Sequence, residues 1–163
     1  GRHPRWLRQP DTIPKGAGAV TQAYTFLEDT AHADLAFEAE GDTPGELFEA
    51  AARALFSSMT NLRRLRPKIT RQIRLRHDQI DQLMFDWLSE LVYLKDAEML
   101  LFGEFSVRII SDNGWGLEAD VKGETISPKH HELRADVKAV TYHQFIVEQT
   151  PEGKWRARVV LDI

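Results

Sequence analysis

Residues 137–143 read Val-Lys-Ala-Val-Thr-Tyr-His and residues 155–163 read Trp-Arg-Ala-Arg-Val-Val-Leu-Asp-Ile, and the architecture is built around these two segments. Apolar side chains occupy every second position of the later segment: Trp155, Ala157, Val159 and Leu161. This period of two is that of a strand with one buried face, and Pro-Glu-Gly at residues 151–153 supplies a turn. The pattern predicts a β-hairpin whose last strand would hold Asp162 beside the carboxylate of Ile163.

Two helices are predicted in the first half of the chain. Thr43, Pro44 and Glu46 form a capping box with proline at the first helical position, so the first helix should begin there and end near Thr60. Apolar residues follow with helical spacing: Leu47, Phe48, Ala51, Ala52, Leu55, Phe56 and Met59. We expect Asp78 to cap a second helix that continues to about residue 95.

Strands are predicted before, between and after these helices. Apolar and polar side chains alternate in four further segments: residues 35–39, 69–75, 105–109 and 115–121. Asp-Asn-Gly at residues 112–114 joins the last two in a hairpin, and residues 123–132 should form a polar loop. The order predicts an α+β fold, with two helices packed on largely antiparallel sheets in a single domain.

Length and composition agree with one globular domain. The chain has 163 residues, of which 42% are hydrophobic and 28% charged, and it contains no cysteine. Disulfides and thiol catalysis are therefore excluded. Because no apolar run reaches the roughly 20 residues of a membrane span and no secretory segment is recognised, we expect a cytoplasmic protein without a membrane partner.

The net charge of −4 is unevenly distributed. Residues 1–22 carry four cations and one anion, which leaves residues 23–163 at −7. An acidic body argues against autonomous nucleic-acid binding and favours binding of a metal or a basic protein. Because residues 1–22 contain several prolines and glycines without a sustained period, we expect a flexible extension there and a folded domain over residues 23–163.

Potential metal ligands gather before the first predicted strand. Asp29, His32 and Asp34 fall within six residues. If the strand extended back that far, His32 and Asp34 would share a face and Asp29 would point the other way. A loop or bulge there would instead let all three side chains converge.

The end of the chain resembles the closing signature of the archease family. The likeness is carried by residues 131–143, by Trp155 and Ala157, and by the final Leu-Asp-Ile, and it extends from about Tyr24 to Ile163. Archeases are small activators of RtcB-type RNA ligases. Such ligases join RNA ends bearing a 2′,3′-cyclic phosphate or 3′-phosphate to 5′-hydroxyl ends, through a ligase histidine that GTP guanylylates with a divalent metal.

This resemblance implies an activator rather than an enzyme. An archease accelerates guanylylation of the ligase and allows multiple turnover, in tRNA splicing or RNA repair. The implied partner is therefore the RtcB-type ligase, with RNA involved only indirectly, and we expect a monomer or a weak oligomer.

The family's first motif, Glu-His-Thr-Ala-Asp with the aspartate as a metal ligand, is altered in this chain. Asp29 stands at the histidine position and His32 at the aspartate position, with Asp34 two residues further on. We expect Asp34 and His32, together with Asp162 and the carboxylate of Ile163, to bind a divalent ion, and Asp29 is the less favoured ligand. Oxygen ligands alone suit calcium or magnesium, whereas a bound His32 imidazole favours manganese or zinc.

Four residues of the closing signature are interpreted as supporting the site or contacting the ligase: Lys138, His131, Glu132 and His143. Lys138 could also be a counter-ion for the carboxylates when no metal is bound. An alternative is that Asp162 simply pairs with a strand cation such as Lys138.

Two other functions remain open from the residues. A freestanding metal-dependent phosphoester hydrolase or transferase could use His32, Asp34 and Asp162. A metal-free chaperone or adaptor would use none of these side chains as ligands. The sequence contains no phosphate-binding Gly-rich loop, no Gly-x-Ser-x-Gly and no His-Glu-x-x-His, so those enzyme classes are not indicated.

Overall fold

The computed structural model describes residues 23–27 and 34–163. In chain order the elements are β1 (Tyr24–Leu27), β2 (Asp34–Gly41), α1 (Pro44–Ser57), the short 3₁₀ helix η3 (Leu62–Arg64), β3 (Ile69–His77), α2 (Ile80–Glu98), β4 (Leu100–Ser111), β5 (Trp115–Thr125), β6 (Ala139–Gln149) and β7 (Trp155–Asp162). The predicted α+β class is confirmed. The strand β1 and the helix η3 were not predicted, and the expected extension at residues 1–22 lies outside the described residues.

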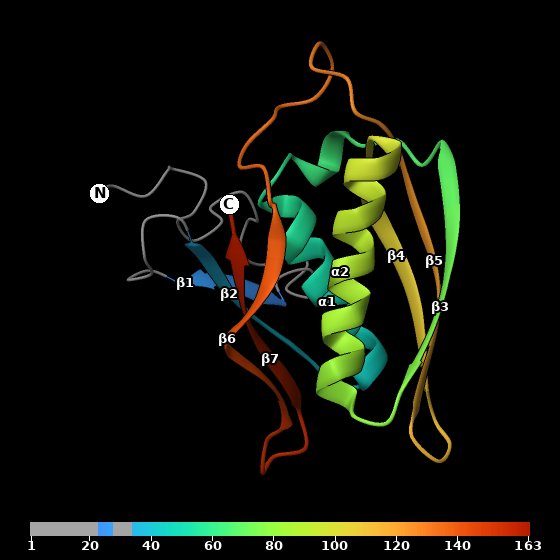
Figure 1. Ribbon diagram of the computed structural model, residues 1–163, viewed down its shortest axis with the longest axis vertical. Helices are drawn as coiled ribbons and strands as arrows, with labels where there is room; N and C mark the ends of the chain where they lie inside the picture. Colours follow the sequence, from blue (N-terminus) through green and yellow to red (C-terminus); the bar gives the residue numbers. More distant parts are fainter. Residues whose placement is uncertain (1–22, 28–33) are drawn as a thin grey trace.

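The strands form two sheets in which every pairing is antiparallel. One sheet has the order β1-β2-β7-β6 and the other has the order β3-β5-β4 (Figure 1). The predicted closing hairpin is β6-β7, and β7 lies in the interior of its sheet because β2 pairs with its other edge. The last strand is therefore hydrogen-bonded on both sides, which holds the end of the chain in place.

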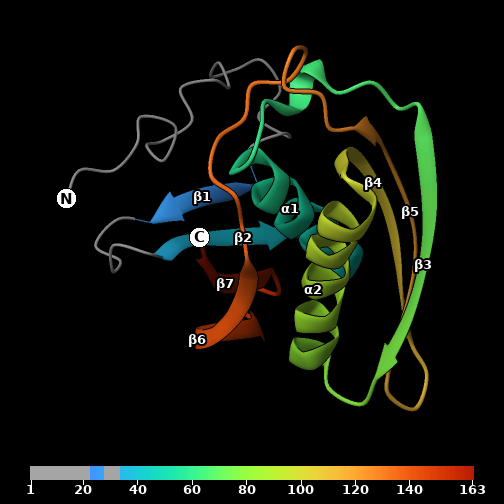
Figure 2. The same cartoon turned by 45° about the horizontal axis from the view of Figure 1, so that its top comes forward.

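The two helices lie between the sheets (Figure 2). Helix α1 contacts β2 in one sheet and β4 in the other, while α2 contacts β6 and β3. Because α1 is enclosed from both sides, alanines as well as large apolar residues are buried along it, among them Ala50, Ala51, Ala52 and Ala54. Between the two helices, the indole Nε1 of Trp87 on α2 donates to the carbonyl oxygen of Phe48 on α1, at 3.0 Å.

The first helix begins as predicted. The backbone N–H of Glu46 donates to Thr43 Oγ1 at 3.2 Å, and Glu46 Oε1 in turn accepts from the N–H of Asp42 at 2.9 Å. The helix ends at Ser57, before the predicted Thr60, because Thr60 forms a β-bridge with Leu133.

The predicted cap of the second helix was wrong. Helix α2 begins at Ile80 with Gln79 as its N-cap residue, and no side chain caps it. Asp78 lies one residue too early, because the chain leaves β3 at His77, whose Nδ1 accepts a hydrogen bond from the N–H of Gln79 at 3.1 Å.

The β4-β5 hairpin forms at the predicted turn, where Asn113 and Gly114 have positive φ angles of 53° and 118°. The polar loop expected at residues 123–132 begins later, however, because β5 continues to Thr125. Gly123 is part of that strand, and a Cβ added there would lie 1.8 Å from the carbonyl oxygen of Leu101. Within the part of the chain that the structure describes, no helix is long and apolar enough to cross a membrane.

Candidate functional site

The end of β7 places two carboxylates opposite each other. Asp34, the first residue of β2, is the cross-strand partner of Asp162, the last residue of β7. Both residues are partly exposed, and their side chains point to the face of the sheet away from the helices, since Leu35 and Leu161 beside them are buried in the core. The structure thus brings together two of the four residues expected to bind metal.

On this outer face of the β2-β7 pair, acidic residues lie opposite arginines except at Asp34. Further along the β2-β7 pair, Glu38 lies opposite Arg158 and Glu40 lies opposite Arg156. Glu38 Oε2 is 4.0 Å from an Arg158 nitrogen, an ordinary surface ion pair. At the Asp34 position, by contrast, the residue across the strand is a second carboxylate, an arrangement that is destabilising unless another group compensates it.

Lys138 and Ile163 adjoin this carboxylate pair. The backbone N–H of Lys138 donates to the carbonyl oxygen of Asp162 at 2.7 Å, which fixes the chain just before β6 against the end of β7. Among residues 23–27 and 34–163 no ion pair joins the Lys138 side chain to Asp162. Ile163 is partly buried and packs against the hydrophobic core.

The other side chains predicted as metal ligands do not extend this carboxylate pair within the described residues. Asp29 and His32 lie outside the described residues, so their positions relative to the carboxylates are not given. Within the described ranges, no group of three or more His, Asp or Glu side chains is arranged to hold a metal ion.

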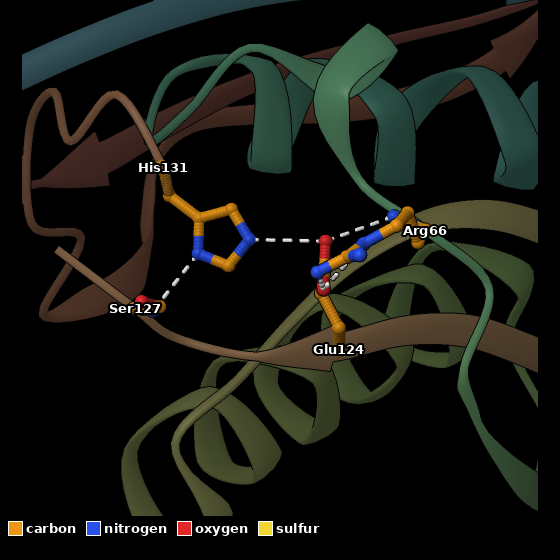
Figure 3. A network of polar contacts seen from close by, with 4 residues as sticks. All are labelled: Arg66, Glu124, Ser127 and His131. Carbon is orange, nitrogen blue, oxygen red and sulfur yellow. Dashed lines mark hydrogen bonds and ion pairs between the residues drawn. The ribbon is translucent and has the colours of Figure 1, made fainter. Parts of the chain in front are cut away.

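His131 belongs to a different cluster, in which a buried carboxylate is held by three groups (Figure 3). Glu124, near the end of β5, is only 6% exposed. Its Oε2 accepts from the N–H of Arg66 at 2.9 Å and lies 3.0 Å from Nε2 of His131, while its Oε1 is 3.2 Å from the Arg66 guanidinium. Because Nδ1 of His131 accepts the N–H of Ser127 at 2.9 Å, the ring hydrogen must reside on Nε2 and face Glu124.

These contacts keep Glu124 ionised. Burial alone would raise the pKa of its carboxyl group, but the Arg66 N–H, the His131 imidazole and the Arg66 guanidinium together outweigh burial and lower the pKa to about 2. The network joins the connector after η3, the end of β5 and the loop that follows β5. His131 is therefore a support for the fold of this loop, at a position separate from the Asp34–Asp162 pair.

Other contacts fasten the same loop, residues 126–138, to the helices. Arg134 donates through Nη1 to the carbonyl oxygen of Ser57 at the end of α1, and its Nε donates to Glu132 at 2.7 Å. Lys95, only 5% exposed near the end of α2, donates to Asp136 at 2.6 Å and to the carbonyl oxygen of Val137 at 3.0 Å. Burial would lower the pKa of Lys95, but the hydrogen bonds to Asp136 and Asp96 raise it, so the amine stays charged.

His143 is placed apart from these contacts. It lies in an irregular stretch of β6, between Thr141 and Ile146, where the register with β7 shifts and Gln144 has a φ of 52°. Its side chain is exposed, and its backbone N–H donates to Thr141 Oγ1 at 3.3 Å. Of the four supporting residues predicted, only Lys138 adjoins Asp162.

Sequence patterns missed Glu124 and Lys95. Glu124 was assigned to a polar loop, because a buried acid at the end of a strand has no local signal that distinguishes it from a loop residue. Lys95 did carry a signal: it follows Leu88 by seven residues and Leu91 by four, so it occupies the buried face of α2.

Comparison with known proteins shows the family. Residues 24–163 match the model of the Archease protein family (MTH1598/TM1083). The chain is 39% identical over 132 residues to Protein archease from Thermococcus kodakarensis, covering 80% of this chain and 93% of the relative. It is 37% identical over 142 residues to Protein archease from Methanosarcina acetivorans, covering 86% of this chain and 95% of the relative.

A solved structure shows the same fold. The solution structure of Methanobacterium thermoautotrophicum protein 1598 superposes with a TM-score of 0.75 at 35% sequence identity, covering 86% of this chain and 99% of that one. Family model, sequence relatives and fold agree, and the chain belongs to the archease protein family.

Proposed function

We propose that this protein activates an RtcB-type RNA ligase, by accelerating guanylylation of the ligase by GTP and so permitting multiple turnover in tRNA splicing or RNA repair. In this proposal the chain is an activator rather than an enzyme, and the ligase is its direct partner. Membership of the archease family supports the proposal. The structural observation that carries it is the pair of opposed carboxylates at Asp34 and Asp162.

A divalent cation suits this pair on chemical grounds. Directly opposed residues of antiparallel strands have Cβ atoms about 4.5–5.5 Å apart. Calcium bonds to carboxylate oxygens at about 2.3–2.6 Å, so one ion can be shared by two such side chains. His32, Asp29 and the carboxylate of Ile163 are proposed as further ligands, with calcium or magnesium expected for oxygen ligands and manganese or zinc if His32 binds.

In this proposal, Asp34, Asp162 and Lys138 act by holding charge at a fixed place on the sheet. The sheet holds Asp34 and Asp162 in place, because β2 and β6 both pair with β7 there. A bound ion would supply positive charge to phosphate oxygens of GTP at the ligase. Lys138 adjoins Asp162 and is proposed as the counter-ion for the carboxylates when no metal is bound.

The test is RNA ligation by the cognate RtcB-type ligase, with the ligase present in substoichiometric amount. Wild-type protein should convert a single turnover into many, and Asp162→Asn should remove that gain. Glu40→Gln is the matched control, because Glu40 is an acid on the same face of β2 that lies opposite an arginine. It should stimulate ligation as the wild type does.

A parallel measurement follows the melting temperature with added calcium, magnesium, manganese or zinc. A ligand at about 100 times its dissociation constant adds about 2.7 kcal/mol to the unfolding free energy, which is readily detected.

If Asp162→Asn stimulates the ligase fully, the proposed role of the carboxylates is wrong. Phosphoester turnover by the protein alone, abolished by Asp34→Ala, would instead support a freestanding hydrolase.

A further inference from the structure

A run of positive charge separates the two helices in sequence. Residues 61–77 contain seven cations and no acidic residue, although the chain as a whole has a net charge of −4. The cations are Arg63, Arg64, Arg66, Lys68, Arg71, Arg74 and Arg76. A concentration of one sign in an otherwise acidic body is a feature that the carboxylate site does not explain.

These residues follow one margin of the molecule. They begin on η3, continue through the connector, and end on β3, which is an edge strand of the β3-β5-β4 sheet (Figure 2). All of them are exposed except Arg71, which is partly buried. All but one of these charges are therefore presented to solvent.

Acidic side chains neutralise only part of this positive charge. Arg66 pairs with Glu124, and Arg71 donates from Nε to Glu98 at 2.8 Å. Arg76 is held differently, since its guanidinium donates to two backbone carbonyl oxygens of the β4-β5 turn, each at 2.7 Å.

The remaining four cations form what we call the basic ridge: Arg63, Arg64, Lys68 and Arg74. Within the described ranges, none of the four makes an ion pair at 4.0 Å or less. Arg74 lies across from Glu118, but Glu118 already pairs with Arg108 on the opposite strand. The ridge thus keeps a surplus of positive charge.

Protection of the sheet edge explains only one of the four. Charged side chains on edge strands commonly prevent edge-to-edge association, which accounts for Arg74 on β3. Arg63 and Arg64 lie on η3 and Lys68 lies in the connector, so these three are in no strand. A separate reason is needed for them.

The composition of the ridge favours a phosphate ligand over a protein partner. Protein interfaces rely on buried apolar or aromatic anchors. None of the exposed large hydrophobic residues of the described chain is among residues 61–77, although Leu133 is bridged to Thr60 beside their start; the six are Tyr93, Met99, Ile110, Leu133, Tyr142 and Ile146. Residues 61–77 also contain no Phe, Tyr or Trp, so bases would not be stacked there and contacts would be to the backbone alone.

We propose that the basic ridge binds the phosphate backbone of RNA, without sequence preference. The identification of the ligand as RNA rests on the proposed ligase-activating function. The expectation that the ridge binds some polyanion rests only on its surplus positive charge. The ridge provides a direct RNA contact, in contrast to the indirect involvement of RNA that the family resemblance implies. Four cations correspond to at most about four phosphates, so log Kobs should fall with log[salt] with a slope of about −3.

The test is fluorescence anisotropy of a labelled oligouridylate with the full chain and no ligase. Arg63→Glu and Arg64→Glu each reverse one charge on exposed side chains. Lys154→Glu is the matched control, because Lys154 is exposed in the β6-β7 hairpin, where its amine is 3.5 Å from Asp42. We expect each ridge variant to weaken binding about tenfold relative to the control and to reduce the salt slope by about 1.

Three results would overturn the proposal. They are equal RNA affinity of the ridge variants and the wild type, equal weakening by Lys154→Glu, and competition by polyglutamate as effective as that by unlabelled RNA, which would point to an acidic protein. Because the assay contains no ligase, its failure is distinguishable from failure of the ligase-activating function. Ridge variants that lose RNA binding but still increase ligase guanylylation by GTP would uphold both.

Discussion

Replacing Glu124 with glutamine should destabilise the protein strongly although the side chain keeps its shape. Its Oε2 accepts a hydrogen bond from the backbone N–H of Arg66 and lies 3.0 Å from Nε2 of His131, while its Oε1 accepts one from Nε of Arg66. An amide offers only one acceptor, so in either orientation its NH₂ group would face a donor in a buried site. Leaving buried donors unpaired is among the most costly effects of a single substitution.

The magnitude follows from the pKa. The carboxyl of Glu124 has its pKa lowered from 4.5 to about 2 in the folded protein, and each unit corresponds to about 1.4 kcal/mol. The ionised form is therefore favoured in the native state by about 3 kcal/mol, and Glu124→Gln should lower the unfolding free energy by about that amount at pH 7.

The same shift predicts a pH dependence. Since the folded pKa is the lower one, the contribution is complete above the unfolded value of 4.5 and disappears as pH falls toward 2. Wild-type protein should lose this stabilisation over that interval, whereas Glu124→Gln has none to lose. The difference between the two proteins should accordingly shrink below pH 4.5.

Urea unfolding followed by tryptophan fluorescence, at several pH values between 7 and 3, measures both effects. Glu118→Gln is the matched control, because Glu118 lies on the same strand and pairs with Arg108 in contact with solvent, where the pairing is screened. A loss of less than about 1 kcal/mol for Glu124→Gln at unchanged m-value, or a difference independent of pH, would refute the reasoning.

Three further substitutions test other parts of the structure. Asp34→Asn should abolish the metal-dependent rise in melting temperature, because it removes one of the two opposed carboxylates proposed to bind the ion; the gain lost would be about 2.7 kcal/mol at about 100 times the dissociation constant, measured by melting with and without added calcium. Gly123→Ala should unfold the protein or give it a cooperative transition at much lower urea, since the new Cβ would lie 1.8 Å from the Leu101 carbonyl oxygen; circular dichroism checks this. Lys95→Met should lower the unfolding free energy by about 1–3 kcal/mol at pH 7, because it leaves the Val137 carbonyl oxygen unpaired. Since the pKa of Lys95 is raised, the wild-type protein should lose this advantage only in alkaline solution, above the ordinary pKa of 10.5.

Local patterns predicted the elements because each depends on neighbouring residues. The capping box at Thr43, the turn at residues 112–114 and the alternation of the last strand all formed where the sequence placed them. Asp78 is not the cap, because Gln79 takes the N-cap position of α2 and its N–H donates to Nδ1 of His77. The short strand β1 was missed because its four residues are too few to establish a period.

Less of the candidate site than of the fold could be predicted from the sequence. Asp34 was identified from the cluster of possible metal ligands before the first predicted strand, and Asp162 from the closing signature and its place at the end of a buried strand. His131 was also singled out, but its partner Glu124 was read as a loop residue. Nothing local indicates that Arg66, 58 residues before Glu124, would supply the compensating charge.

Periodicity, capping residues and composition in this chain specify which segments are helices or strands, which faces are apolar and where turns occur, since these are short-range properties. The opposition of Asp34 to Asp162, the burial of Glu124 and the surplus charge of the basic ridge arise only once strands far apart in the chain have paired and the loop has docked. Strand register and the partners of buried charges are non-local, because they depend on which surfaces meet rather than on the residues next to them.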